Sequence, residues 1–227
     1  MEAFKVFGLQ HILVMIFGLI GIFIALFISN INYRLIPKIM GTFILFIKLG
    51  ELAYRHIINK EPIYNLLPLH LCNLALIIAI LIMVFGIKSL FQVLYYWSIG
   101  AIFAILTPEV NAPLPNFVTI SFFVTHLFIL FAPLCCIFIF NLRPTKSGIW
   151  VSVLTLNIIS LIVYFINNKL GTNYLYINRI PEFTSPLQYF GQWPYYLIVL
   201  EAIFLILAHL MYLPFRRRRS HYISKKW

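Results

Sequence analysis

The amino-acid sequence predicts an all-α, polytopic membrane protein with seven transmembrane helices. Of its 227 residues, 62% are hydrophobic and only 10% are charged, and the mean hydropathy is +0.95. Soluble domains carry about 25% charged residues. The apolar residues also gather in long runs, each close to the roughly 20 residues that cross a bilayer. Composition and run length therefore both indicate a helical bundle in a membrane.

The seven predicted helices share one domain, residues 1–215, which is followed by a basic tail, residues 216–227. The first apolar run follows Glu2 and has no small-residue cleavage site, so it predicts a spanning helix and not a signal peptide. The helices are expected at 7–29, 36–58, 66–87, 90–106, 117–140, 149–166 and 194–213.

The orientation follows from the Lys and Arg residues between the helices, because cytoplasmic loops are enriched in them. Arg34, Lys88 and Arg143 fall in alternate connections, on the same side as four consecutive arginines at 216–219. This pattern predicts an outside N-terminus and a cytoplasmic C-terminus in the cell membrane. Much of the net charge of +11 lies in the tail, so it favours contact with anionic lipid and does not indicate nucleic acid.

The predicted outer connection 167–193 is long and rich in aromatic residues, among them Tyr174, Tyr176 and Phe183. A solvated linker would be more polar. We therefore expect this connection to pack over the outer end of the bundle.

The predicted helix 36–58 carries a charged stripe. Lys48, Glu51 and Arg55 fall within about 60° of one another at 100° per residue. Each charge costs about 2.5–3.5 kcal/mol at mid-membrane on insertion scales, so the stripe must face the bundle interior. Two interpretations stay open: an internally neutralised ion pair that holds helices together, or a site that positions a phosphate head group.

A second polar group marks the start of the predicted helix 66–87. His70, Cys72 and Asn73 lie within four residues, and Pro68 suits the first turn of a helix. Beyond Asn73 the run is almost purely aliphatic. A Cys beside polar groups at a membrane edge is typical of a nucleophile, but it is also compatible with a structural contact.

His126 is the better predicted base for Cys72. His70 and Cys72 are two residues apart, so on one helix they face opposite ways. His126 comes from another predicted helix and can approach the thiol. Cys135 and Cys136 are interpreted as small packing residues.

Other polar side chains are expected at the same outer depth, whereas the inner half of the predicted bundle is nearly bare of them. This one-sided clustering predicts a site in the outer half. No cofactor is expected. No metal is expected either, because the histidines lack the spacing of metal ligands and the chain has no Asp. The additional outer residues are His11, His56, Thr107 and Glu201.

The segment Leu67-Pro68-Leu69-His70-Leu71-Cys72 resembles the signature of the YwaF-type bacterial integral membrane proteins. The bacterial proteins are similar in turn to a eukaryotic transmembrane family that moves fatty acyl chains onto ether phospholipids. The resemblance implies a nucleophile at Cys72 and a His on a later helix, for which His126 is the candidate. Further matching segments are Leu106-Thr107-Pro108, Ser121-Phe122-Phe123 with His126, Arg143-Pro144, Asn173-Tyr174-Leu175-Tyr176, and Gly191-Gln192-Trp193-Pro194 followed by Glu201.

The sequence therefore predicts a lipid acyltransferase or lipid hydrolase that acts on membrane phospholipid through Cys72 and His126. His70 or Asn73 would stabilise the oxyanion. The alternatives are a non-enzymatic protein that binds or transports a lipid or small anion, and a structural subunit. The predicted substrate-binding or supporting residues are Lys48, Glu51, Arg55, His56, Asn73, Thr107, Asn173, Tyr174 and Glu201.

Overall fold

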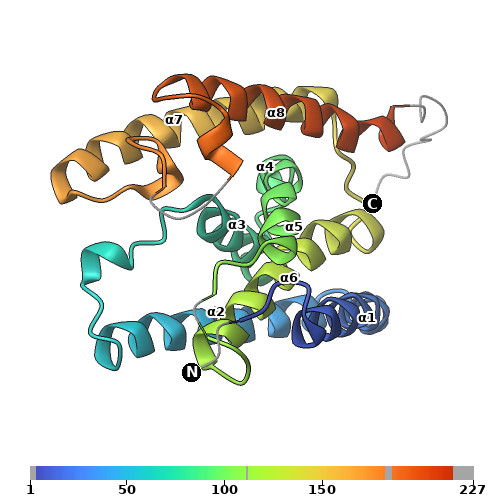
Figure 1. Cartoon of the computed structure of the whole chain (residues 1–227). Coiled ribbons are helices and arrows are strands. Elements are labelled where there is room, and N and C mark those ends of the chain that lie inside the picture. The colour runs from blue at the N-terminus through green and yellow to red at the C-terminus, as the bar shows by residue number, and fades with distance from the viewer. Residues whose placement is uncertain (1–3, 111, 182–185, 217–227) are drawn as a thin grey trace.

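The computed structural model describes residues 4–110, 112–181 and 186–216, and this part is helical without a β-strand (Figure 1). Phe183 and the tail beyond Arg216 lie outside the described residues. Short 3-10 turns, which include η1 (Ile63–Asn65) and η3 (Tyr174–Tyr176), connect some of the α-helices. The α-helices are α1 (Leu9–Ile31), α2 (Leu35–Ile57), α3 (Leu71–Phe85), α4 (Phe91–Trp97), α5 (Ile99–Leu106), α6 (Phe117–Phe138), α7 (Lys146–Leu170) and α8 (Tyr195–Tyr212).

Each predicted helix corresponds to one helical unit, but the unit expected at 90–106 is broken into α4 and α5 at Ser98. The Ser98 hydroxyl donates a hydrogen bond to the Tyr95 carbonyl at 2.7 Å. Such a bond from a serine to its own backbone competes with regular helix geometry. The break therefore has a local cause.

The third predicted helix begins at Leu71 and not at Leu66, so the expectation that Pro68 lies in its first turn is wrong. A residue before proline is pushed away from helical geometry, which disfavours a helix through Leu67. The Leu67 amide instead donates to the Tyr174 hydroxyl at 3.0 Å. This segment is therefore held as a connection by the distant loop that follows α7.

Five helical units in the described residues are long and apolar enough to cross a membrane. The units α2 and α3 are not among them, because α2 carries several charges and α3 has only 15 residues. The chain is thus a helical protein with several candidate spans. Seven crossings and the orientation of the termini stay predictions. The five units are Leu9–Ile31, Lys88–Leu106, Phe117–Phe138, Lys146–Leu170 and Tyr195–Phe215.

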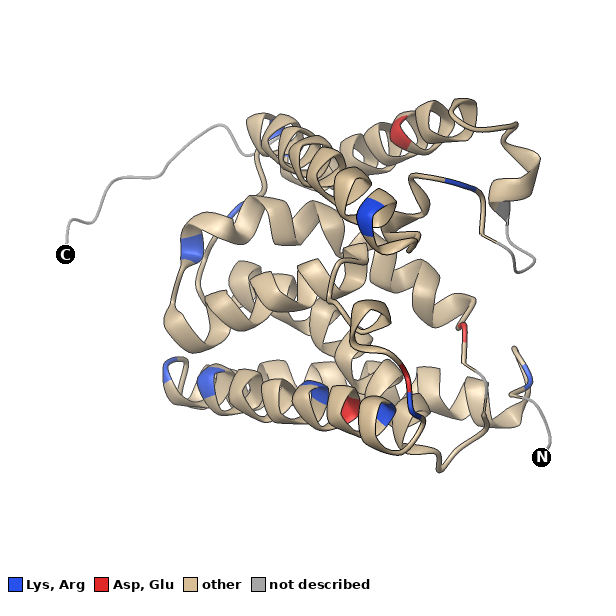
Figure 2. Ribbon diagram, turned by 90° about the vertical axis from the view of Figure 1, so that its left-hand side faces the viewer, with Lys and Arg blue, Asp and Glu red and all other residues tan. Residues whose placement is uncertain are grey.

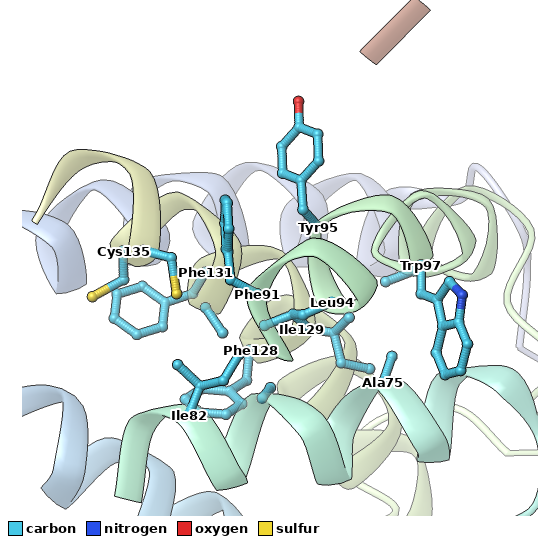
Figure 3. Packing of buried hydrophobic residues seen from close by; sticks show 14 of the residues in the cluster. Ala75, Ile82, Phe91, Leu94, Tyr95, Trp97, Phe128, Ile129, Phe131 and Cys135 are labelled. Atoms are coloured by element: carbon cyan, nitrogen blue, oxygen red, sulfur yellow. The ribbon is translucent and has the colours of Figure 1, made fainter. Parts of the chain in front are cut away.

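The helix α6 lies at the centre of the packing and contacts α1, α2, α3 and α5. The helix α7 packs on α4 and α8 packs on α7, so these two helices form a layer on the side of the molecule opposite α1 and α2 (Figure 1). Apolar side chains of α3, α4 and α6 meet between the layers, where Ile82, Leu94 and Phe131 are almost fully buried (Figure 3). This core sets the relative positions of α3 and α6.

His11 joins the start of α1 to the end of α5. Its side chain is fully buried. Nδ1 accepts a hydrogen bond from the Phe7 amide at 2.9 Å, so Nε2 carries the proton and donates to the Ile105 carbonyl at 2.7 Å. Both ring nitrogens have backbone partners, and the role of His11 is structural.

Gly41 allows α2 to approach α3. A Cβ atom at Gly41 would lie 2.9 Å from Val84 Cγ2 and 3.1 Å from Met83 Cβ, whereas a Cβ at Gly21 of α1 would meet nothing within 4 Å. We expect Gly41→Leu to lower the free energy of unfolding by about 1–3 kcal/mol, because it overpacks this contact. Thermal unfolding in detergent measures the effect. Gly21→Leu is the matched control, and equal losses in the two variants would contradict the proposed close contact.

Candidate functional site

The charged stripe of α2 is built around the Glu51 carboxylate. Glu51 is only 4% exposed. Its Oε2 accepts hydrogen bonds from Lys48 Nζ at 2.8 Å and from the Ser121 hydroxyl at 2.7 Å, and its Oε1 lies 3.4 Å from Arg55 Nη1. Because Ser121 belongs to α6, the carboxylate ties α2 to the central helix. The stripe faces the interior, as the sequence predicts.

Arg55 extends this network beyond the end of α2 to Glu61. Its Nη2 lies 2.6 Å from Glu61 Oε2, and its Nε donates to Glu61 Oε1 at 3.0 Å. The hydrogen bond from Arg55 lowers the pKa of the Glu61 carboxyl. Lys48, Glu51, Arg55 and Glu61 together carry no net charge. Charged positions gather along α2 and in the connection that follows it (Figure 2).

Cys72 and His70 come from the start of α3 and His126 comes from α6, and all three lie near Lys48 of α2. Cys72 lies half-buried in the first turn of α3, His70 directly precedes that helix, and His126 lies on α6. The Lys48 ammonium is within electrostatic range of all three side chains. In the described part of the chain, no hydrogen bond joins the Cys72 thiol to either histidine. A Cβ at Gly100 of α5 would lie 3.9 Å from Cys72 Sγ.

The orientation of the His126 ring is fixed by its own helix. Nδ1 lies 2.6 Å from the Phe122 carbonyl and must donate to it, and the Phe122 ring centroid is 4.1 Å from that of the imidazole. In a neutral imidazole with the proton on Nδ1, Nε2 carries the lone pair. His126 can therefore accept a proton at Nε2.

His70 packs against two tyrosines of the loop that follows α7. Its ring centroid is 5.0 Å from that of Tyr174 and 5.3 Å from that of Tyr176. Burial, together with the positive charges of Arg55 and Lys48, lowers the pKa of His70 to about 4. His70 is therefore neutral at pH 7 and can donate or accept a hydrogen bond, but adds no charge. Its side chain does not cap α3.

Tyr174 clamps the loop that follows α7 to the segment before α3. Its hydroxyl donates to the Tyr64 carbonyl at 2.8 Å and accepts from the Leu67 amide. The Tyr174 backbone amide donates a hydrogen bond to Asn167 Oδ1 at 2.9 Å. The described part of the loop thus packs against the entrance to α3. The φ angles of Leu175 and Tyr176, 58° and 52°, lie in the left-handed region, where each residue costs about 1–3 kcal/mol.

Tyr176 is a member of the site that the sequence did not single out. It interacts electrostatically with Cys72 and Glu109, and its carbonyl accepts a hydrogen bond from the Tyr196 hydroxyl. The aromatic character of the loop indicated packing, but it could not identify which ring lies beside the thiol. The backbone of this segment places the Tyr176 ring beside His70.

Three predicted supporting residues have other local partners. Glu201 accepts a hydrogen bond from Asn157 of α7 at 2.8 Å. The Thr107 hydroxyl donates to the Phe103 carbonyl of its own helix, and exposed His56 hydrogen-bonds to the Glu61 carbonyl at 3.0 Å. None of these contacts joins the group around Lys48.

Two further predicted residues lie at the edges of the site. The Asn173 side chain donates to the Arg179 carbonyl at 2.8 Å and so shapes the loop that follows α7. Asn73 is half-buried in the first turn of α3. Within the described ranges, no three side chains among His, Cys, Asp and Glu gather in a way that could hold a metal ion.

The apolar helices and buried polar network define a multi-pass helical membrane protein. The profile of the TMEM164 family matches residues 6–212, so the chain belongs to the TMEM164 family. It is 31% identical over 180 residues to a Treponema pallidum (strain Nichols) protein described as an uncharacterized protein. That match covers 78% of this chain and 73% of the relative. No solved structure gives a significant match. None of these matches names a reaction.

We expect Glu51→Ala to lower the free energy of unfolding by about 1–3 kcal/mol, because it leaves half-buried Lys48 without its carboxylate partner and the buried Ser121 hydroxyl without its acceptor. Chemical unfolding in detergent measures the change. Lys38→Ala is the matched control, because it removes an exposed charge from the same helix. A loss no larger than that of the control would contradict a stabilising network.

The Arg55–Glu61 pair should make stability depend on pH. The folded-state pKa of Glu61 lies below its unfolded value of about 4.5, so the contribution of the pair is complete above that pH and is lost as the pH falls through the folded value. The wild type should exceed Glu61→Gln in thermal stability at pH 7, and the gap should close below about pH 4.5. A gap of constant size between pH 7 and pH 3 would argue against the pair.

Proposed function

We propose that this protein is a cell-membrane enzyme that transfers or hydrolyses the acyl groups of phospholipids, with Cys72 as nucleophile and His126 as base. The observation that supports the proposal is that Cys72 and His70, at the start of α3, and His126, on α6, all lie within electrostatic range of Lys48. Covalent acyl transfer requires a nucleophile and a general base close to each other, and here they come from separate helices.

The ring orientation of His126 supports its role as the base. A catalytic histidine needs one nitrogen held by a fixed acceptor and the other available for the proton. The Phe122 carbonyl is the fixed acceptor for Nδ1. Nε2 is then the atom that takes the thiol proton.

In the proposed reaction, His126 Nε2 removes the proton of the Cys72 thiol, and the thiolate attacks the carbonyl carbon of a lipid ester. The tetrahedral intermediate collapses when the ester C–O bond breaks, and the leaving lysolipid alkoxide takes the proton from His126. The acyl chain is now a thioester on Cys72. The hydroxyl group of a second lipid, or water, then attacks this thioester while His126 Nε2 takes its proton. The C–S bond breaks, the Cys72 thiolate leaves and regains the proton from His126, and the acylated lipid or the free fatty acid is released.

The oxyanion of the intermediate would form beside the start of α3. The amides of a first helical turn have no partners within the helix, and no side chain caps this one. These amides, together with neutral His70 or Asn73, would stabilise the developing charge. No metal or cofactor enters this reaction.

The ion-pair network supports a positioning role for α2 over direct capture of a phosphate. Lys48 and Arg55 already contact Glu51 and Glu61. An anion would have to displace these carboxylates, which disfavours the alternative of an anion-binding or transport protein. We assign Glu51 and Arg55 to holding the helices around the thiol, and the basic tail to contact with anionic lipid.

The thiol and imidazole must approach each other when the lipid binds. Catalytic hydrogen bonds in unliganded enzymes are often long and tighten only in the complex. The resemblance to the YwaF-type proteins and to the ether-phospholipid acyltransferases supports the same pair. The outer loop, clamped by Tyr174, would cover the bound lipid.

The first test is mass spectrometry of the purified protein after incubation with phospholipid. We expect an acyl adduct on Cys72 that is absent from Cys72→Ser and reduced at least about 100-fold in rate in His126→Ala, as general bases contribute 10²–10⁴-fold. His209→Ala is a matched control because His209 Nδ1 makes the same contact with its own helix, at the Leu205 carbonyl. Cys135→Ser is the matched control for the thiol.

An adduct that requires Cys72 and His126, but neither control residue, supports the proposed pair. Wild-type lipid turnover in Cys72→Ala and His126→Ala would reject it. A Cys72 that takes up neither acyl groups nor a small alkylating reagent would favour the binding protein. If Cys72 is alkylated by the reagent but carries no acyl adduct, single-turnover kinetics decide. Loss of lipid turnover after alkylation then supports Cys72 as the nucleophile.

A further inference from the structure

A polar pair lies on the α7–α8 layer, away from the site around Cys72. Asn157 Nδ2 of α7 donates a hydrogen bond to Glu201 Oε1 of α8 at 2.8 Å, and both side chains are exposed. The α7–α8 layer and α2, which carries the charged stripe, lie on opposite sides of the molecule (Figure 2). The pair is therefore separate from the charged network.

The pair lies at membrane depth. Both helices belong to the units that are long and apolar enough to span a bilayer. At 1.5 Å per residue, Glu201 is about 9 Å from the first residue of α8, and Asn157 is about 16 Å from the first residue of α7. The hydrocarbon core is about 30 Å thick. Both side chains thus fall within it when these helices span.

An exposed carboxyl group at this depth needs a partner. Ionisable side chains in spanning helices almost always face the bundle interior or a water-filled cavity, and they pair there. The Glu201 side chain is instead exposed on the α7–α8 layer. Large apolar side chains near it on these two helices are also exposed. These neighbours are Leu154, Ile158, Leu161 and Ile198.

The pair presents hydrogen-bond acceptors and no spare donor. The two N–H groups of the Asn157 amide are used, one by Glu201 and one by the Val153 carbonyl at 3.0 Å. Glu201 Oε2 and Asn157 Oδ1 accept no hydrogen bond from the residues that the structure describes. A partner that completes this face must therefore bring donors, and a cation would also match the carboxylate.

We infer that this face of α7 and α8 binds the transmembrane helix of another protein, one that carries a Lys or Arg near the middle of the bilayer. Interhelical polar contacts of this kind act as specific links between apolar helices. A second copy of the same face would bring only further acceptors, so it does not complement the first. This inference does not depend on the proposed chemistry at Cys72.

The test uses the full chain in phospholipid vesicles, labelled at its C-terminus for energy transfer. Its probe is a labelled poly-leucine transmembrane peptide with one central Lys, and the comparison peptide has Leu at that position. We expect the Lys peptide to associate about tenfold more tightly. Glu201→Gln should abolish this preference, because the glutamine still accepts from Asn157 but carries no charge.

Thr155→Val is the matched control on α7, since the Thr155 hydroxyl only donates to the Val151 carbonyl of its own helix. It should leave the preference unchanged. Equal association of the two peptides, or a preference that survives Glu201→Gln, would overturn the inference. Self-association of the protein that requires Glu201 would also overturn it, in favour of a homo-oligomer. Unfolding curves of each variant verify that the fold is intact.

Discussion

The buried Glu51 carboxylate is the contact on which the arrangement of the site depends. It pairs with Lys48 and Arg55 on its own helix and accepts a hydrogen bond from Ser121 of α6. Without it, Lys48 would lose its carboxylate partner, because Glu61 compensates only Arg55. The same contact holds Lys48 beside His70, Cys72 and His126. One carboxylate thus fixes both the packing of α2 and the electrostatic surroundings of the thiol.

The sequence predicted the helical units well because each is a long apolar run, and such runs have few other ways to satisfy their backbone in a membrane. Their ends were harder to predict. The start of α3 is set by a hydrogen bond between Leu67 and Tyr174, which are far apart in the chain. The break at Ser98 rests on one rotamer of one side chain. Apolar patterning carries neither kind of information.

The candidate site was predictable where it is local. Lys48, Glu51 and Arg55 share a face because helical spacing requires it, and the pairs that they form are those expected at i,i+3 and i,i+4. Glu61 and Ser121 were missed because their contacts depend on the end of α2 and on the rotation of α6. Glu201 shows the limit of depth arguments. Its height along a helix could be estimated from the sequence, but the direction in which it faces could not.

The Tyr174 clamp has a consequence for biosynthesis. Tyr174 and Tyr64 are separated by 110 positions in the chain, so their hydrogen bond can form only after the ribosome has made α3 to α7. Bringing such distant segments together also carries a loop-closure entropy that local helix formation does not. The entrance to α3 is therefore completed late, when most of the bundle is already in the membrane. Until that moment His70 of a newly made chain lacks its two tyrosine neighbours.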